Sequence, residues 1–325
     1  MMNVEQIQQN ARRAKLPEFC VKALEELSKK IIDRKKEDFF EVCLEKCKDH
    51  TLKDEEILKE FPAPDEADLF RMLIIVALIG YGETLYREKN IPLEIFEENL
   101  LDAPIWLEYH MDNYARPGFQ WRIVEWCRTL WEGNVLKFGR LQLETAGAYK
   151  EKYNTYRTKE GRIVFAAGEE AQKDWECLLT KGDRLVSIHI PASGPLKKEE
   201  CIASFRKMRE YLAKYRPDIE YKAVRCSSWL LDPQLKDILP STSNILAFQT
   251  LGHVNASKTY VTETIGRVFG EKAVTDGINA VPHKTGMQKL LAAFAAKGGR
   301  FDNGVMLILK EEFDALCDGK CTAIS

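Results

Sequence analysis

The 325-residue chain lacks an excess of charge of either sign, since 48 lysines and arginines stand against 50 aspartates and glutamates. A chain so evenly charged has no basic footprint for nucleic acid, and we expect no nucleic-acid partner. No apolar run reaches the length that spans a membrane, and the first residues, Met1-Met-Asn-Val-Glu-Gln, lack a basic stretch followed by an apolar one. We therefore expect neither a membrane partner nor a secretion signal.

The cysteines form neither a disulfide framework nor a metal-binding pattern, because the nine of them are scattered along the chain. Cys43, Cys47 and His50 share one helical face, but a metal site needs a further ligand, so a buried structural role is favoured. Reduced cysteines suit the cytoplasm, and we expect a cytoplasmic protein without a metal.

Hydrophobic periodicity divides the chain into two parts. Residues 1–130 have the apolar spacing of amphipathic helices, and the segment 69–78 is apolar on most faces, as expected of a buried central helix. Residues 131–325 alternate between short apolar strands and amphipathic helices. We predict an all-α N-terminal domain over 1–130 and an α+β domain with a central mixed β-sheet over 131–325.

Within the second part, the apolar pattern predicts strands over 185–190, 221–226 and 244–249 and a helix over 197–215. The turn Pro191-Ala-Ser-Gly-Pro195 separates the first strand from the helix. A turn of this kind aims unpaired backbone N–H groups outward and forms a ready site for an anion such as a diphosphate. An ordinary strand-to-helix turn with solvated lysines is the alternative.

We place a cofactor at this turn and expect the edge of strand 185–190 to stay open for its tail. Two lysines in the first helical turn support an anion, because the helix dipole disfavours cations there. The predicted cofactor-binding residues are Ile190, Ser193, Gly194, Leu196, Lys197 and Lys198.

Two side chains are candidates for a general base. Strand alternation puts His189 on the face opposite Ile188, where a neutral imidazole could take a proton from an amine. Glu144 lies at the end of another predicted strand and could act as a base through water. A half-buried structural histidine and a surface carboxylate are the alternatives.

The end of strand 221–226 supplies the candidates for substrate contact, which are Cys226, Ser228 and Trp229. A cysteine nucleophile needs a base beside it, which the sequence does not reveal, and neither serine lies in a nucleophile-elbow pattern. We therefore expect direct attack without a covalent intermediate.

Four motifs together resemble those of bacterial acyltransferase-domain proteins. They are Gly139-Arg-Leu-Gln-Leu-Glu144, His189-Ile-Pro-Ala-Ser-Gly-Pro195, Ser228-Trp-Leu-Leu-Asp-Pro-Gln-Leu235 and Ser243-Asn-Ile-Leu-Ala-Phe-Gln249. The resemblance covers nearly the whole chain and implies a helical N-acyltransferase-type N-terminal domain followed by a GNAT-like domain. In such domains acyl-CoA lies in a gap beside a central strand, here 185–190, with its pyrophosphate on the following loop.

The resemblance implies an enzyme that moves an acyl group, with acetyl the expected one, from acetyl-CoA or another acyl-CoA to the amine of a small molecule or peptide. His189 or Glu144 would accept the amine proton, and the helical domain would cover the acceptor side. The turn lacks the usual Arg/Gln-x-x-Gly-x-Gly/Ala pattern of the superfamily, and this departure favours a second interpretation, a GNAT-like domain that binds a ligand or protein without chemistry.

Overall fold

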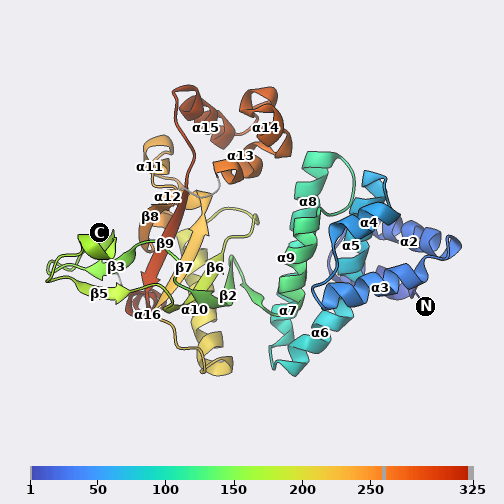
Figure 1. Ribbon diagram of the computed structural model, residues 1–325, viewed down its shortest axis with the longest axis horizontal. Helices are drawn as coiled ribbons and strands as arrows, with labels where there is room; N and C mark the ends of the chain where they lie inside the picture. The colour runs from blue at the N-terminus through green and yellow to red at the C-terminus, as the bar shows by residue number, and fades with distance from the viewer. Residues whose placement is uncertain (1, 258–260, 321–325) are drawn as a thin grey trace. The chain divides into compact units, whose positions relative to one another are not determined.

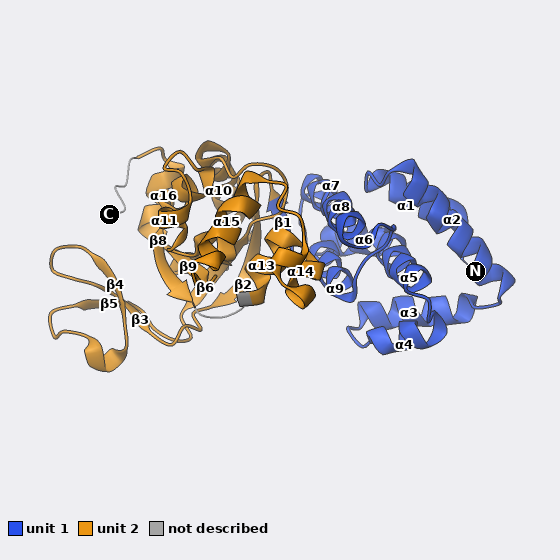
Figure 2. Ribbon diagram, turned by 90° about the horizontal axis from the view of Figure 1, so that it is seen from above, with its two compact units in different colours: residues 1–137 blue, residues 138–325 orange. Residues whose placement is uncertain are grey.

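A computed structural model of the chain describes residues 2–257 and 261–320. It divides into two compact units, residues 1–137 and residues 138–325, shown in blue and orange in Figure 2. The division falls seven residues after the boundary that composition suggests. Each unit has its own buried apolar core.

The described part of the first unit is helical up to Trp131, as predicted (Figure 1). Its cap residues match their positions: Asn3 accepts a hydrogen bond from the N–H of Gln6, and Pro64 occupies the first helical turn. The helices are α1 (Val4–Arg13), α2 (Glu18–Asp33), α3 (Glu37–Lys48), α4 (Asp54–Glu60), α5 (Pro64–Ala77), α6 (Ile79–Glu88), α7 (Leu93–Leu100), α8 (Asp102–Tyr114) and α9 (Trp121–Trp131).

Helix α5 is the buried central helix that the apolar run predicts. Together with α6 it gives a stretch, Pro64–Glu88, that is long and apolar enough to cross a membrane by length and composition alone, contrary to the expectation from single apolar runs. The most apolar window of that stretch is 61% buried inside the protein. This burial is what the core helix of a folded domain requires.

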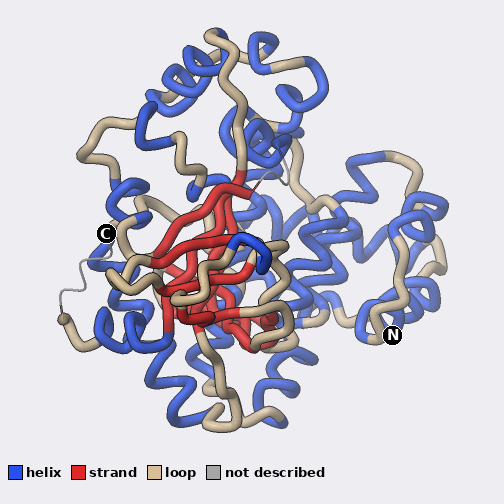
Figure 3. Tube along the Cα trace, turned by 60° about the vertical axis from the view of Figure 1, so that its left-hand side comes forward, coloured by secondary structure: helices blue, strands red, loops and turns tan. Residues whose placement is uncertain are grey.

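A mixed sheet with the strand order β1-β2-β6-β7-β9-β8 forms the second unit, except that the first three residues of β1 are the last three of the first unit. The pairs β2–β6, β7–β9 and β8–β9 are antiparallel, whereas β6–β7 is parallel. The strands are β1 (Val135–Phe138), β2 (Leu141–Ala148), β6 (Arg184–His189), β7 (Ala223–Ser228), β8 (His253–Ser257) and β9 (Asn303–Leu309). The predicted mixed central sheet is therefore confirmed (Figure 3).

Helices and a second, smaller sheet contact the central sheet. Helix α10 (Lys198–Tyr215) and helix α16 (Lys310–Cys317) pack against each other, and contact strands β2, β7 and β9. The small sheet has the order β4-β3-β5, and its residues Ile163, Phe165 and Leu179 pack in one cluster with residues of β6, β7 and β9. Its strands are β3 (Asn154–Arg157), β4 (Ile163–Ala166) and β5 (Glu176–Leu179).

Short helices complete the described part of this unit. The apolar spacing of the sequence also predicts helices over 257–269 and 284–297. The second corresponds to α15, which Thr285 caps by accepting a hydrogen bond from the N–H of Gln288. The first corresponds to α13, but its predicted start, Ser257, is the last residue of β8, and 258–260 lie outside the described residues. The helices are η1 (Gly168–Glu170), η2 (Trp229–Leu231), α11 (Leu235–Ile238), α12 (Asn244–Gln249), α13 (Val261–Phe269), α14 (Glu271–Asp276), η3 (Ile278–Ala280) and α15 (Gly286–Ala296).

The strand predicted over 244–249 is wrong, because this segment forms helix α12. Ser243 caps it by accepting a hydrogen bond from the N–H of Ile245. A short apolar run fits a strand and a helix equally well. The place beside β7 in the sheet belongs instead to β9, some 60 residues further along the chain.

Candidate functional site

The candidate site lies where β6 and β7 stop pairing. The two parallel strands pair from Leu185 with Ala223 to Ile188 with Cys226. Strand β7 continues to Ser228 in register with β9, whereas its register with β6 ends at Ile188. The expectation that the whole edge 185–190 is open is therefore wrong for its first four residues. The two strands no longer pair beyond Ile188, so the end of β6 is the part of the predicted edge to which an extended ligand could add.

His189 and Glu144 come together at this point. Glu144 on β2 is opposite Ser187, and His189 lies two residues further along β6 on the same face. The Nε2 atom of His189 is 2.8 Å from Oε2 of Glu144, and each side chain is about one-third exposed, at 33% and 35%. The pair thus combines a fixed geometry with access from solvent.

Gln142 is directly opposite His189 on the neighbouring strand. Its side chain is 1% exposed, and its Nε2 atom is buried without a hydrogen-bond partner in the part of the chain that the structure describes. A buried amide donor without a partner carries a desolvation cost of about 1–3 kcal/mol. A buried donor of this kind calls for an explanation, and a ligand oxygen that accepts from it is one.

A further polar group continues the face on the other side of His189. Arg225 is the β7 partner of Ser187, and its Nη2 atom lies 2.9 Å from a carboxylate oxygen of Glu151. Tyr153 is hydrogen-bonded to Asn255, and burial raises the pKa of its hydroxyl. The sheet therefore presents polar side chains on one face of four strands.

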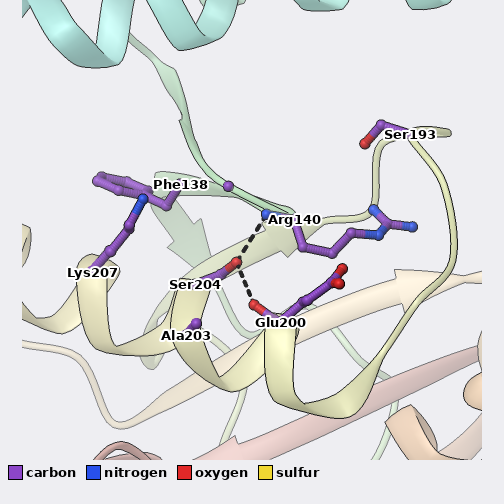
Figure 4. Close-up of a pocket in the computed structure, with 8 residues that line it drawn as sticks. Phe138, Arg140, Ser193, Glu200, Ala203, Ser204 and Lys207 are labelled. Atoms are coloured by element: carbon purple, nitrogen blue, oxygen red, sulfur yellow. Dashed lines mark hydrogen bonds between the residues drawn. The ribbon is translucent and has the colours of Figure 1, made fainter.

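The turn after β6 is held by one arginine. Arg140 donates from Nη1 to the carbonyl of Pro191 at 2.8 Å, from Nη2 to that of Gly194 at 3.1 Å and from Nε to that of Pro195 at 3.0 Å. Figure 4 shows the Arg140 side chain extending toward the loop that carries Ser193. Gly194 has φ +77°, a left-handed conformation that suits glycine.

The carbonyls of this turn accept hydrogen bonds from Arg140, whereas several of its N–H groups have no acceptor among the described residues. The N–H groups of Ser193, Gly194 and Leu196 make no hydrogen bond to any residue that the structure describes. Helix α10 begins directly afterwards, and the N–H groups of its first turn have no intrahelical partner. The turn and the helix start therefore offer several donors to an anion, as the sequence predicts for such a turn.

The two lysines at this helix start already have partners. Lys197 lies 3.1 Å from Glu200, and Lys198 donates to the hydroxyl of Thr250 at 3.0 Å. Both contacts are exposed, where ion pairs contribute little and side chains rearrange easily.

The three predicted substrate contacts have different surroundings. The Cys226 side chain is 1% exposed, and burial raises the pKa of its thiol to about 12, so this thiol is inert and does not face a substrate. Ser228 caps η2 through the N–H of Leu230. Trp229 is half-buried and packs against the cluster of Leu235 and Phe269.

The sequence motifs did not identify Arg140 and Gln142 as site residues, although both stand in the Gly139–Glu144 motif. The available signal was local: Gly139 has φ +70° and forms a tight turn, and alternation places Gln142 on the face of Glu144. Residues 2–257 and 261–320 contain no group of three metal-binding side chains placed to hold an ion.

Comparison with known protein families assigns both units. Residues 5–133 match the N-acyltransferase N-terminal domain, and residues 135–306, more than half of the chain, match the GNAT-like C-terminal domain. The chain therefore belongs to the family of proteins with a GNAT-like C-terminal domain, here preceded by an N-acyltransferase N-terminal domain. The resemblance inferred from the motifs is confirmed. No curated protein matches the chain.

Solved structures with the same fold are acyltransferases. An acyltransferase mutant in complex with octanoyl-CoA is 17% identical, with a TM-score of 0.63, over 93% of this chain and 87% of the other. An acyltransferase in complex with decanoyl-CoA and teicoplanin is 19% identical, with a TM-score of 0.62, over 91% of this chain and 86% of the other. At these identities the likeness establishes the fold.

Proposed function

We propose that the chain is an acyl-CoA-dependent N-acyltransferase. The observation that carries the proposal is the contact of 2.8 Å between His189 and Glu144 at the point where β6 and β7 separate. Membership in an N-acyltransferase family and the octanoyl-CoA and decanoyl-CoA in structures of the same fold support it. The free cysteines of the described residues support the cytoplasm as its location.

In the proposed complex, the diphosphate of CoA accepts hydrogen bonds from the N–H groups of Ser193, Gly194 and Leu196 and from the start of α10. Lys197 and Lys198 lie in the same region and would exchange their exposed contacts for the phosphates. The pantetheine arm runs along the open end of β6 at Ile190. Backbone N–H groups there would polarise the thioester carbonyl.

The reaction is a direct transfer. The amine nitrogen of the acceptor attacks the thioester carbonyl carbon, the C–N bond forms, and the C–S bond breaks to release the CoA thiolate. Glu144 accepts a hydrogen bond from Nε2 of His189 and thereby favours the tautomer whose lone pair is on Nδ1. That nitrogen takes the proton of the amine and delivers it to the thiolate, which leaves an amide and CoA.

For the two substrates, we propose the chemical class of the acceptor and that of the transferred group. The acceptor is an amine on a small molecule or a peptide, bound on the polar face that carries Glu144, Arg225 and Glu151. The transferred group is an acyl chain, for which acetyl-, octanoyl- and decanoyl-CoA are the three donors to compare. Ser228 is the last residue of β7 and Trp229 follows it, and both would contact the acceptor there.

Substitution of the proposed base tests the mechanism. We expect His189→Ala and Glu144→Gln to lower kcat by about 10²–10⁴-fold, the usual contribution of a positioned base, while CoA still raises Tm. Release of the CoA thiol is followed with an amine panel and the three donors, beside a thermal-shift titration.

A matched control exists in the same unit. His253 and Glu312 form a second pair with the same 2.8 Å separation, on β8 and α16. His253→Gln should leave turnover within about twofold of wild type, since a contact away from the reacting atoms adds no transition-state stabilisation. Retained turnover in His189→Ala would remove His189 as the base. A Tm shift with CoA but no transfer to any amine would favour the non-catalytic binding domain.

A further inference from the structure

Arg140 has no part in the proposed reaction, but it forms three hydrogen bonds to the turn proposed to bind the CoA diphosphate. Its guanidinium reaches a turn more than 50 residues further along the chain and donates to three carbonyls there, those of Pro191, Gly194 and Pro195. It forms no ion pair with any residue that the structure describes, so its charge is not neutralised by a carboxylate contact. Three donors from one rigid fork fix the position of a short loop more tightly than separate side chains can.

Arg140 is itself anchored to the helix that follows the turn. Its backbone N–H donates to Oγ of Ser204 at 3.1 Å, and the same hydroxyl donates to the carbonyl of Glu200 at 3.0 Å (Figure 4). Ser204 is 2% exposed, and both residues lie on α10. Arg140 thus joins the β1–β2 turn, the 191–195 turn and α10 into one arrangement.

The direction of these bonds has a consequence for the other side of the turn. In a trans peptide the C=O and the following N–H point in opposite directions, so the carbonyls of Pro191 and Pro195, turned toward the guanidinium, direct the N–H groups of Ala192 and Leu196 away from it. A concave set of unpaired N–H groups is an anion-binding nest. A loop held in this shape before binding spares the ligand the entropy of ordering it.

We propose that Arg140 is a positioning residue that holds the 191–195 turn in the conformation that binds the diphosphate of acyl-CoA. This inference rests on the proposed function. It assigns to Arg140 the preference of the enzyme for a donor that carries a diphosphate. Arg140 acts through the backbone of the turn and does not touch the reacting atoms.

The test compares kcat/KM for two donors, one with and one without the nucleotide part that contains the diphosphate. The first is an acyl-CoA, and the second is the S-acyl-pantetheine with the same acyl chain, which keeps the thioester and the arm but has no diphosphate. We expect Arg140→Ala to lower kcat/KM for acyl-CoA by about tenfold or more. The change should appear in KM, because the substitution weakens binding of the donor and leaves the chemical step unchanged. For S-acyl-pantetheine, kcat/KM should stay within about twofold of wild type.

Arg140→Lys separates geometry from charge. Lysine keeps the positive charge but lacks the planar fork, so we expect its ratio of kcat/KM between the two donors to fall nearly as far as that of Arg140→Ala. An Arg140→Lys enzyme with the wild-type ratio would overturn the positioning role. If Arg140→Ala does not fold, as judged by loss of activity with both donors, Arg140→Lys carries the test.

Chemical rescue and a second arginine complete the design. Arg140 lines an open pocket of about 390 Å³ with Ser193, Glu200 and Lys207, so a free guanidinium ion can reach the space that Arg140→Ala leaves. Guanidinium chloride should restore the KM for acyl-CoA, and potassium chloride at equal concentration should not. Arg206→Ala removes an arginine of α10 that donates to the carbonyl of Cys317 and should leave the donor ratio unchanged.

The outcomes distinguish the two proposals. A wild-type protein that transfers from neither donor contradicts the proposed function. A wild-type protein that is active, with a donor ratio that Arg140→Ala does not change, contradicts the role of Arg140 alone.

Discussion

At the scale of single residues, burial decides which reactive side chains can take part in chemistry. Cys226 is fully covered on the sheet, and burial raises the pKa of its thiol to about 12. Cys201 and Cys43 are buried as well, with thiol pKa values also raised to about 12 by burial. Cys177, in contrast, is exposed on β5. The partly exposed pair of His189 and Glu144 keeps the contact with solvent that proton transfer needs.

Thiol labelling checks this difference. At pH 8 a thiol with a pKa of about 12 is a thiolate in about one molecule in ten thousand, and a buried thiol is also hidden from reagent. We therefore expect iodoacetamide to alkylate Cys177 in the native protein at least about 100-fold faster than Cys226. Peptide mass spectrometry over a time course measures both rates. Rapid native labelling of Cys226 would mean that β7 opens to solvent.

At the scale of elements, the close packing of η2 against β9 requires a glycine at position 304. Gly304 pairs with Ser228 on one side and Ala256 on the other. A Cβ atom at Gly304 would lie 1.7 Å from the carbonyl oxygen of Leu231 and 2.3 Å from its carbon. Both are backbone atoms, so the overlap is relieved only if η2 moves away from the strand.

Gly304→Ala should therefore lower the free energy of unfolding by about 3 kcal/mol or more, at the upper end of overpacking costs. Urea denaturation followed by circular dichroism measures the change. Gly286→Ala is the matched control, because a Cβ there meets nothing within 4 Å and the residue begins α15. Its effect should lie within about 1 kcal/mol and favour the helix. Equal stability of the two variants would contradict the close contact.

At the scale of the whole molecule, stability at low pH depends on a buried charge in the helical unit. Asp68 is 1% exposed and accepts hydrogen bonds from Arg71 at 2.6 Å, Arg116 at 2.6 Å and Gln120 at 3.0 Å. Burial acts to raise the pKa of Asp68, but His110 and Arg116 outweigh it and hold that pKa below its ordinary value. The ionised form is thus the one that the folded state prefers.

A carboxyl whose pKa is lower in the folded state stabilises the fold above its unfolded pKa of about 4 and loses that contribution as pH falls. Asp68→Asn removes a charged acceptor from Arg71, which keeps Asp54 as its carboxylate partner, and from the partly exposed Arg116, and should cost about 1–3 kcal/mol at pH 7. The stability gap between wild type and Asp68→Asn should narrow below about pH 4. Denaturant titrations at pH 7 and pH 3 measure it, and a constant gap would show that Asp68 is not charged in the native protein.

The sequence alone determined the order of the elements. The helical first part, the strand and helix over 184–215 and the buried last strand follow from hydrophobic period, which depends on neighbours in the chain. The turn at 191–195 was also predictable, because a glycine and two prolines before a helix specify its backbone locally. His189 and Glu144 were recognisable as candidates from alternation within their own strands.

Only the tertiary structure decided which of these groups meet. The register of β2 against β6 brings Glu144 to His189 across 45 residues, and Arg140 reaches the turn across more than 50. The segment 244–249 forms a helix, and β9 takes the place beside β7 in the sheet. Strand register, sheet order and reach of a long side chain depend on contacts between distant segments, and the local pattern of one segment contains no information about its partner.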